Sequence, residues 1–427
     1  MNKILYPKRE KWTEILKRPT ATFDNIVPLV QEIFSEIKNN GDEAIKKYAL
    51  KFDKFELSNF EVAQKEIQKA ENTISKELKE AIQLAKINIE TFHRSQRKEV
   101  TKIETSPGVI CWQEKRPIEK VGLYIPGGTA PLFSTILMLA IPAQLAGCDE
   151  IILCTPPNDK GEIHPAILYT AKLCGLTKIF KIGGIQAIGA LTFGTESVLK
   201  VDKIFGPGNQ FVTVAKQIST QHGIAIDMPA GPSELLVLAD KSANPVYIAA
   251  DLLSQAEHGI DSQVILVTGD TDFAEKVEKE VNDQIQKLSR KKIAQKAIAN
   301  SKIIISKIDK DSIDLINFYA PEHLIICTEN NDFFISNLKN AGSVFIGNYT
   351  PESAGDYASG TNHTLPTNGF AKAYSGVNLD SFMKSITFQE ISKTGIMEIG
   401  PAIEIMAANE GLDAHKNAVT LRLNDLK

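Results

Sequence analysis

The sequence lacks the features that mark a secreted, membrane-bound or nucleic-acid-binding protein. Its five cysteines are an odd number without a CxxC pair. This argues against a disulfide framework or a thiolate zinc cluster, and favours thiols in a reducing cytoplasm. The formal charge of −4, from 48 basic and 52 acidic residues, offers no basic surface for nucleic acid or for an anionic membrane. The N-terminus has no long apolar segment of the signal-peptide type.

Long apolar runs are also missing, with one stretch that needs a closer look. From Val121 to Cys148 there is no charged residue, which is long enough to raise the question of a membrane helix. The prolines at 126, 131 and 142 and the glycines at 127 and 128 interrupt the run and leave residues 132–141 as one apolar helical piece. We therefore predict a glycine-rich loop followed by a buried helix, and no membrane segment.

The pattern of apolar segments predicts an α/β fold. A chain of 427 residues corresponds to about two to four domains. From about residue 119, short apolar strands alternate with helices, which indicates parallel sheets covered on both faces. There are enough strands for two such sheets, with a break near residues 229–232. Residues 28–100 read as amphipathic helices, and residues 381–426 read as a helical C-terminal arm.

Glycine-containing loops follow three predicted strands of the first sheet, at 124–128, 183–186 and 206–209. Ligands of open parallel sheets bind beyond the carboxyl ends of the strands, and glycine lets the backbone approach them closely. A helix that follows such a loop attracts phosphate at its N-terminus. The complete G-x-G-x-x-G pattern is absent, because residues 206–211 lack the third glycine. The three loops together favour a nucleotide site, with ordinary tight turns as the alternative.

Histidine is scarce, and four of the seven histidines lie after residue 257, beside a carboxylate or an amide. Gln255 and His258 are three residues apart near the end of a predicted helix and therefore share a face. Glu322 and His323 are adjacent at a turn before a strand, where they offer two proton-transfer groups.

The other two histidines lie further along the chain. Asp356 and His363 flank a polar, glycine-bounded loop, and His415 follows Glu410 in the predicted arm. Each group alone is explained equally well as a helix cap, a solvated pair or a turn. Together they provide only oxygen and nitrogen ligands, which suit zinc or manganese in an open site.

At these residues the sequence resembles the histidinol dehydrogenase family. The resemblance extends from residue 41 to residue 419, and no functional position departs from the family pattern. The motifs that carry it are GLYIPGG at 122–128, KIFGPGN at 203–209, DMPAGPSE at 227–234, QAEHG at 255–259 and GTNH at 360–363.

The resemblance implies a homodimer in which each chain has two incomplete Rossmann-like domains and a C-terminal arm exchanged between the subunits. We expect an N-terminal segment at 1–25 and a first Rossmann-like domain formed by 26–118 with 234–375, which carries most metal and catalytic residues. The second, NAD-binding domain is expected at 119–233, and the arm at 376–427.

The resemblance also implies the site residues. One Zn²⁺ per subunit would be held by Gln255, His258, Asp356 and the partner subunit's His415. NAD would contact Tyr124, Gln186 and Asn209. The substrate would be held by the metal ligands together with Ser233, His323 and Glu410.

The implied reaction is the oxidation of L-histidinol through L-histidinaldehyde to L-histidine with two NAD, the final steps of histidine biosynthesis in the cytoplasm. His323 would take the alcohol proton, and Glu322 would activate the water that attacks the aldehyde. Two other hypotheses remain open at this point. They are a zinc hydrolase with Glu322 as general base, and a non-catalytic metal-binding oligomer.

Overall fold

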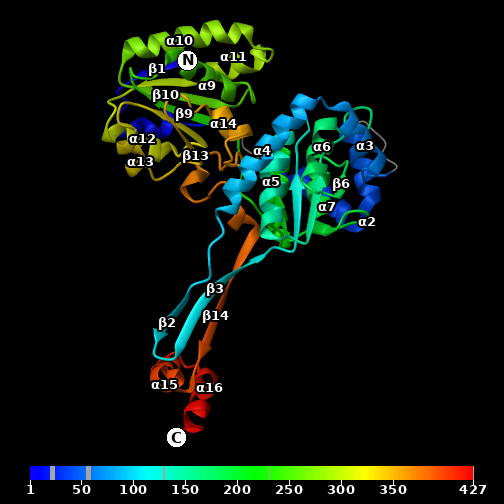
Figure 1. Cartoon of the computed structure of the whole chain (residues 1–427), viewed down its shortest axis with the longest axis vertical. Helices are drawn as coiled ribbons and strands as arrows, with labels where there is room; N and C mark the ends of the chain where they lie inside the picture. Colours follow the sequence, from blue (N-terminus) through cyan, green and yellow to red (C-terminus); the bar gives the residue numbers. More distant parts are fainter. Residues whose placement is uncertain (20–24, 54–58, 128–129, 230, 427) are drawn as a thin grey trace.

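The protein consists of two α/β domains and a long projecting arm (Figure 1). This computed structural model describes residues 1–19, 25–53, 59–127, 130–229 and 231–426. Gly128 and Ala230, which belong to two of the sequence motifs, lie outside the described residues, as does Lys427 of the predicted arm. Each domain is built on an entirely parallel sheet, which confirms the predicted α/β class.

The six-stranded sheet has the order β1-β11-β10-β9-β12-β13. Its central strand β9 is buried on both faces: Leu235 and Val237 point into one core, and Leu236 and Leu238 into the other. Helices α9, α10 and α11 cover the first core, and α1, α12 and α13 cover the second. The bounds are β1 (Asn2–Leu5), β9 (Glu234–Ala239), β10 (Gln263–Thr268), β11 (Lys302–Ile305), β12 (His323–Cys327), β13 (Ser343–Ile346), α1 (Trp12–Ile15), α9 (Pro245–Ala256), α10 (Thr271–Gln284), α11 (Lys291–Ala299), α12 (Lys310–Tyr319) and α13 (Asn331–Asn337).

The five-stranded sheet has the order β6-β5-β4-β7-β8. Helices α3, α4, α5 and α6 pack on one face, and α2, α7 and α8 on the other. The bounds are β4 (Lys120–Tyr124), β5 (Glu150–Cys154), β6 (Lys178–Phe180), β7 (Lys203–Phe205), β8 (Ala225–Ile226), α2 (Val27–Asp53), α3 (Gln64–Thr73), α4 (Lys76–Arg94), α5 (Phe133–Ala146), α6 (Pro165–Leu173), α7 (Gly184–Phe193) and α8 (Gln210–Ser219).

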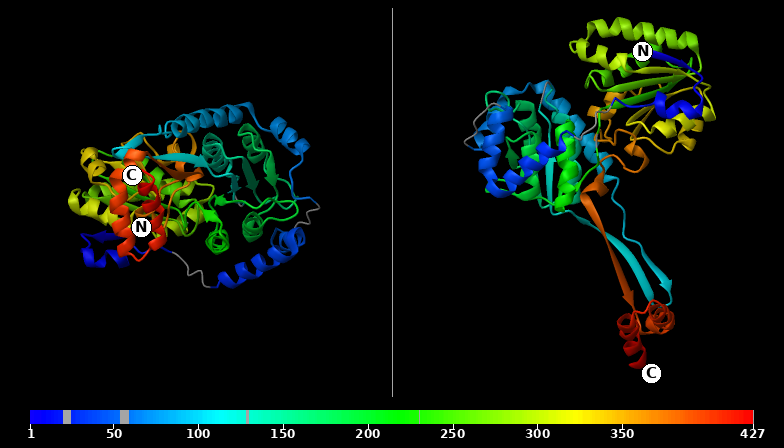
Figure 2. Two further views of the ribbon diagram at one scale, coloured as in Figure 1. Left: turned by 90° about the horizontal axis from the view of Figure 1, so that it is seen from below. Right: turned by 180° about the vertical axis from the view of Figure 1, so that it is seen from behind.

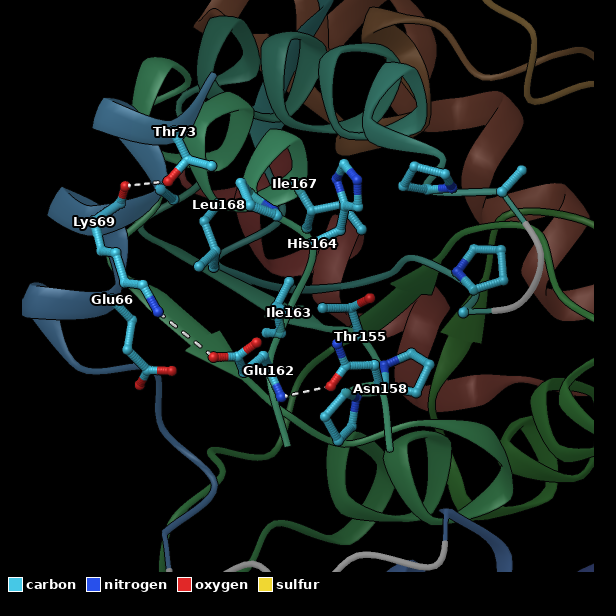
Figure 3. A pocket seen from close by; sticks show the side chains of 18 residues that line it. Glu66, Lys69, Thr73, Thr155, Asn158, Glu162, Ile163, His164, Ile167 and Leu168 are labelled. Carbon is cyan, nitrogen blue, oxygen red and sulfur yellow. Dashed lines mark hydrogen bonds and ion pairs between the residues drawn. The ribbon is translucent and has the colours of Figure 1, made fainter. Parts of the chain in front are cut away.

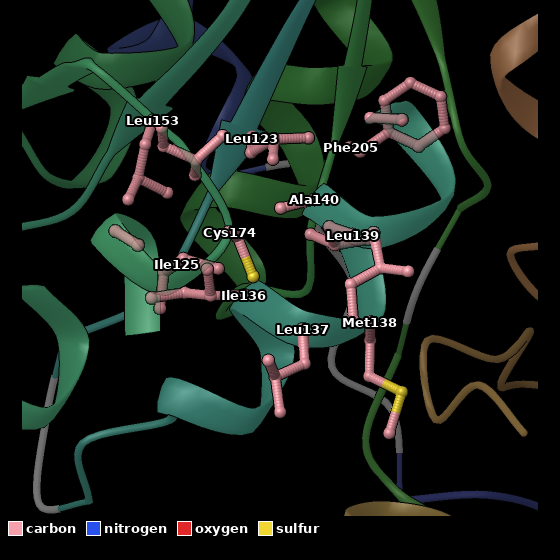
Figure 4. Close-up of a cluster of buried hydrophobic side chains, with 14 of the residues drawn as sticks. Leu123, Ile125, Ile136, Leu137, Met138, Leu139, Ala140, Leu153, Cys174 and Phe205 are labelled. Carbon is pink, nitrogen blue, oxygen red and sulfur yellow. The ribbon is translucent and has the colours of Figure 1, made fainter. Parts of the chain in front are cut away.

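Helix α5 occupies the uncharged stretch of the sequence and confirms its interpretation as a loop followed by a buried helix. Its residues from Ser134 to Ala143 are all buried, and Figure 4 shows Ile136 beside Ile125, the residue that follows β4. In the described part of the chain, no helix is both long enough and apolar enough to cross a membrane.

The domain boundaries differ from the expected ones. Residues 26–118 were expected to join 234–375, but α2, α3 and α4 bury their apolar faces on the five-stranded sheet, as Ile33 and Ile89 illustrate. The N-terminal segment is likewise no separate unit. Strand β1 pairs with β11, and Trp12 and Leu16 fill the second core of the six-stranded domain. The apolar face of an amphipathic helix does not reveal which sheet covers it.

The arm is partly a sheet rather than wholly helical (Figure 2). Strand β14 (Met383–Ile391) pairs antiparallel with β3 (Val109–Pro117), and β3 pairs with β2 (Lys102–Ser106). The expected helix over residues 381–391 was therefore wrong. Helices α15 (Lys393–Asn409) and α16 (Asp413–Asn424) form the tip. The projecting part begins at β14, because Phe382 is fully buried and stacks on Phe205 at 4.0 Å between ring centroids.

Candidate active site

The cluster of polar residues in the six-stranded domain lies at the amino ends of two adjacent central strands. Ser233 immediately precedes β9, and His323 is the first residue of β12, in register with Leu235. Helix α9 runs back along the sheet and brings Gln255 and His258 to the same edge. The chain topology therefore brings these residues, which are far apart in the sequence, to the same edge of the six-stranded sheet.

His323 is buried and held by hydrogen bonding to the backbone. Its Nδ1 lies 3.3 Å from the carbonyl oxygen of Glu234. A carbonyl oxygen only accepts, so Nδ1 carries the ring proton and Nε2 is the free base. Burial lowers the pKa of His323 to about 4, although the nearby Asp356 carboxylate acts in the opposite direction. The ring is therefore neutral, and its unprotonated Nε2 is available to accept a proton.

Three carboxyl groups surround this imidazole. Oxygens of Glu322 and Glu352 lie 3.7 and 3.9 Å from Nδ1 of His323, and one of Asp356 lies 3.8 Å from Nε2. Burial raises the pKa of Glu322 well above its ordinary value, and the charges of Glu234 and Asp356 add to this effect. Burial likewise raises the pKa of Glu352, and the charge of Asp356 raises it further. Crowded, dry carboxyl groups of this kind are typical of catalytic and metal sites.

Glu352 is a site residue that the sequence reasoning missed. It lies on α14 (Glu352–Tyr357) one helical turn before Asp356, and that i,i+4 spacing was a signal that could have revealed it. Ligand atoms of His323, Glu352 and Asp356 lie within 4.8 Å of one another, close enough to hold one metal ion. When the amide of the fully buried Gln255 is oriented to pair donor with acceptor, its nitrogen donates a hydrogen bond to Glu352.

His258 and His363 complete the cluster. His258 is exposed at the wall of a cavity, whose partial exclusion of bulk water lowers the pKa of the ring, while the charge of Asp356 opposes that change. His363 hydrogen-bonds through Nδ1 to the carbonyl oxygen of Asp356 at 2.9 Å, and through Nε2 to Thr135 of α5 at 3.1 Å. His363 thus joins the cluster to the five-stranded domain.

A cavity of about 490 Å³ connects the two domains at this point. Asn209, Gln210 and Phe211, at the start of α8, line one side of it. Ser233 and His258 line the other. The third glycine-containing loop therefore faces the predicted metal and substrate residues across a shared space.

The other two loops lie at the carboxyl ends of their strands. The backbone N–H of Gly184 donates to the hydroxyl of Tyr124 at 3.1 Å, so the first two loops touch each other, and Gln186 is buried on the first turn of α7. Asn209 accepts hydrogen bonds from the first turn of α8 and caps that helix. Contact of these three residues with NAD stays a prediction.

A second cavity, of about 530 Å³, opens where the chain leaves β4 and β5 (Figure 3). Thr155, Asn158 and His164 line it, together with Glu66 and Lys69 of α3. Its position beyond the carboxyl ends of parallel strands is the usual one for a nucleotide.

Two predicted site residues lie far from the cluster. Glu410 and His415 are exposed at the tip of the arm, which Figure 1 shows well away from both sheets. Within one chain they do not reach Gln255 or Asp356.

The sequence matches the family model described as histidinol dehydrogenase over residues 16–423. The chain belongs to the histidinol dehydrogenase family. It is 62% identical over 427 residues to the histidinol dehydrogenase of Bacteroides thetaiotaomicron, with all of both chains covered. It is 55% identical over 417 residues to the enzyme of Campylobacter jejuni, covering 97% of this chain and 96% of the other.

A solved structure supports the same assignment. The crystal structure of histidinol dehydrogenase from Elizabethkingia anophelis is 55% identical in sequence. It superposes with a TM-score of 0.98 and covers 100% of this chain and 98% of that one. The protein is thus an oxidoreductase of an NAD-using family of histidine biosynthesis, which confirms the resemblance noted in the sequence.

Proposed function

We propose that the protein oxidises L-histidinol through L-histidinaldehyde to L-histidine with two NAD and one Zn²⁺ per subunit. The observation that carries this proposal is the buried pair of Glu322 and His323. Both bind the backbone of Glu234, which follows Ser233 in the wall of the cavity that Asn209 lines from the opposite side. Family membership supports the substrate and the cofactor.

The donor set fits zinc. In the orientation of Gln255 in which its amide nitrogen donates to Glu352, the amide oxygen is the atom left for a metal. His258 and Asp356 add a nitrogen and a carboxylate oxygen, and Glu352 acts as the group that orients Gln255. Bound zinc would fix the substrate's polar atoms and, being redox-silent, would leave the electrons to NAD.

The protein's own residues supply the proton transfers. Nε2 of His323 takes the hydroxyl proton of L-histidinol, and hydride would pass from the carbon that bears this hydroxyl to the nicotinamide of NAD. Glu322, as carboxylate, takes a proton from the water that attacks the aldehyde, and its raised pKa makes it a stronger base than an exposed glutamate. His323, once it has released its first proton to solvent, deprotonates the resulting hydrate for the second hydride transfer. The two hydrides would carry four electrons to two NAD in turn, and water provides the new carboxyl oxygen.

We propose further that the arm completes the site of a second subunit in a homodimer. Ile405 and Met406 at the arm tip are each 65% exposed, which indicates a covering partner. In the proposed dimer the partner subunit's His415 ligates the zinc, and the partner subunit's Glu410 contacts the substrate. Exchange of the arm explains why both residues are remote from the cluster in their own chain.

We also infer a cytoplasmic location. All five cysteines are free thiols, and burial raises the pKa of Cys154 and Cys174 to about 12. Such thiols are unreactive, and free cysteines are typical of a reducing compartment.

The test is the appearance of NADH absorbance when zinc-loaded protein meets L-histidinol and NAD. A dehydrogenase forms NADH only when both are present. A zinc hydrolase with Glu322 as base forms none, and neither does a non-catalytic metal-binding oligomer. Absence of NADH with metal-replete protein would therefore overturn the proposed function.

A further inference from the structure

Arg18 lies just beyond α1, at the end of the segment that docks on the six-stranded domain. Its guanidinium forms a bidentate pair with Glu234, with 2.5 Å from Nε to Oε1 and 2.9 Å from Nη2 to Oε2. Side-chain exposure is 15% for Arg18 and 2% for Glu234. The guanidinium also stacks 4.0 Å from the centre of the Tyr319 ring. Bidentate pairing of this kind, largely shielded from water, holds the two side chains in one relative orientation.

The same guanidinium binds the turn that leads to the catalytic pair. Nη2 of Arg18 donates to the carbonyl oxygens of Tyr319 at 2.7 Å and Ala320 at 3.4 Å. Ala320 has φ +54°, a left-handed conformation that is strained for a residue with a side chain and must be held by its surroundings. Pro321, Glu322 and His323 follow directly. Arg18 therefore holds the entry to β12.

Glu234, the partner of Arg18, holds both proton-transfer residues with its backbone. Its N–H donates to Oε2 of Glu322 at 2.8 Å, and its carbonyl oxygen accepts from Nδ1 of His323 at 3.3 Å. Its side chain is fixed a second time by the N–H of Asn368, which donates to Oε1 at 2.7 Å. Any movement of Glu234 would displace Glu322 and His323 together.

We propose that Arg18 is a positioning residue for the reaction, which sets Glu322 and His323 by clamping Glu234 and the turn at 319–320. This inference rests on the proposed roles of Glu322 and His323. Arg18 itself touches no reacting atom in this scheme. Its neighbour Pro19 lines the cavity between the domains, so the segment is close enough to act on the site.

The test compares three variants for kcat, for KM of both substrates and for zinc content. Arg18→Met should lower kcat by about a hundredfold, the effect of misplacing reacting groups by about 1 Å. The KM for NAD and the zinc content should stay unchanged, because Asn209 and Gln255 have no bond to the clamp. Arg18→Lys keeps the charge but cannot form the bidentate pair with Glu234, so its kcat should lie between those of Arg18→Met and the wild type. Glu234→Gln should resemble Arg18→Met.

Ile304→Ala is the matched control for general destabilisation. Ile304 is buried in the same core as Leu16, on β11, two strands from β9. Its register through Val267 places it level with Leu238, at the opposite end of β9 from Glu234. Ile304→Ala should lower Tm and leave kcat unchanged.

A wild-type kcat in Arg18→Met would overturn the proposal that Arg18 positions Glu322 and His323. So would a loss that follows zinc content, or an equal loss in Ile304→Ala. If Arg18→Met is insoluble, wild-type kcat in both Arg18→Lys and Glu234→Gln overturns it. A wild-type protein that forms no NADH would overturn the proposed function and the clamp with it.

Discussion

Replacing Lys216 by methionine should destabilise the five-stranded domain and weaken NAD binding together. Lys216 of α8 is 3% exposed, forms an ion pair with Asp227, and donates to the carbonyl oxygen of Gly206 at 2.8 Å. Asp227, 1% exposed, accepts from the N–H of Gly206 at 2.8 Å. The pair thus holds both backbone groups of the first residue in the loop that ends at Asn209.

The magnitude follows from the buried charge that the substitution leaves behind. Removing one partner of a buried ion pair costs about 3–5 kcal/mol, because the other charge is left without compensation. Lys203 also interacts with Asp227, so we expect the lower limit, about 3 kcal/mol. In Lys216→Met/Asp227→Asn the buried carboxylate is removed and an acceptor for Gly206 is kept. Lys203 loses the charge of Asp227 but keeps its hydrogen bond to the carbonyl oxygen of Ser381 at 2.8 Å. The free energy of unfolding of this double variant should return to within about 1 kcal/mol of wild type.

The assay is urea unfolding of the full-length single and double variants, with steady-state kinetics on each. In Lys216→Met the loosened loop should raise the KM for NAD by about tenfold, equivalent to about 1.4 kcal/mol, with the KM for L-histidinol unchanged. A stability loss below about 1 kcal/mol would refute the reasoning. A double variant no more stable than the single one would refute it as well.

Four further predictions concern the site itself. His323→Asn should lower kcat by about 10²–10⁴-fold and leave zinc content unchanged in metal analysis; retained turnover would remove His323 from the base role. Gly206→Ala should lower stability by at least about 1 kcal/mol and raise the KM for NAD, because φ is +128° and a Cβ would collide with the Tyr124 carbonyl; unchanged values would refute this. Chelation should abolish turnover until Zn²⁺ is restored, and activity that survives metal removal would contradict the zinc site. Mixing His415→Ala chains with Gln255→Ala chains should restore activity in mixed dimers, and no recovery would refute the shared site.

The strands of both sheets could be predicted because their signal is local. Runs such as 235–238 and 324–327 are short, apolar and bounded by loops, and the structure has β9 and β12 there. The Gln255–His258 spacing on a helix end was equally readable. These features depend on a few neighbouring residues, which a single sequence displays directly.

The rest depends on which surfaces meet, and a single sequence does not display that. Amphipathic α2 has a buried face whichever sheet covers it, so its domain was assigned wrongly. Strand β2 is exposed at four of its five residues and has no core-facing alternation to reveal it. Glu352 was missed because no histidine stands beside it, and its partners Gln255 and His323 come from distant elements.

The most direct test of the account is the ratio of NADH formed to L-histidine formed, measured on the same sample with zinc-loaded wild-type protein. Two successive oxidations at one site, with His323 as base in both, predict a ratio of two. A ratio of one would contradict the four-electron reaction and the role proposed for Glu322.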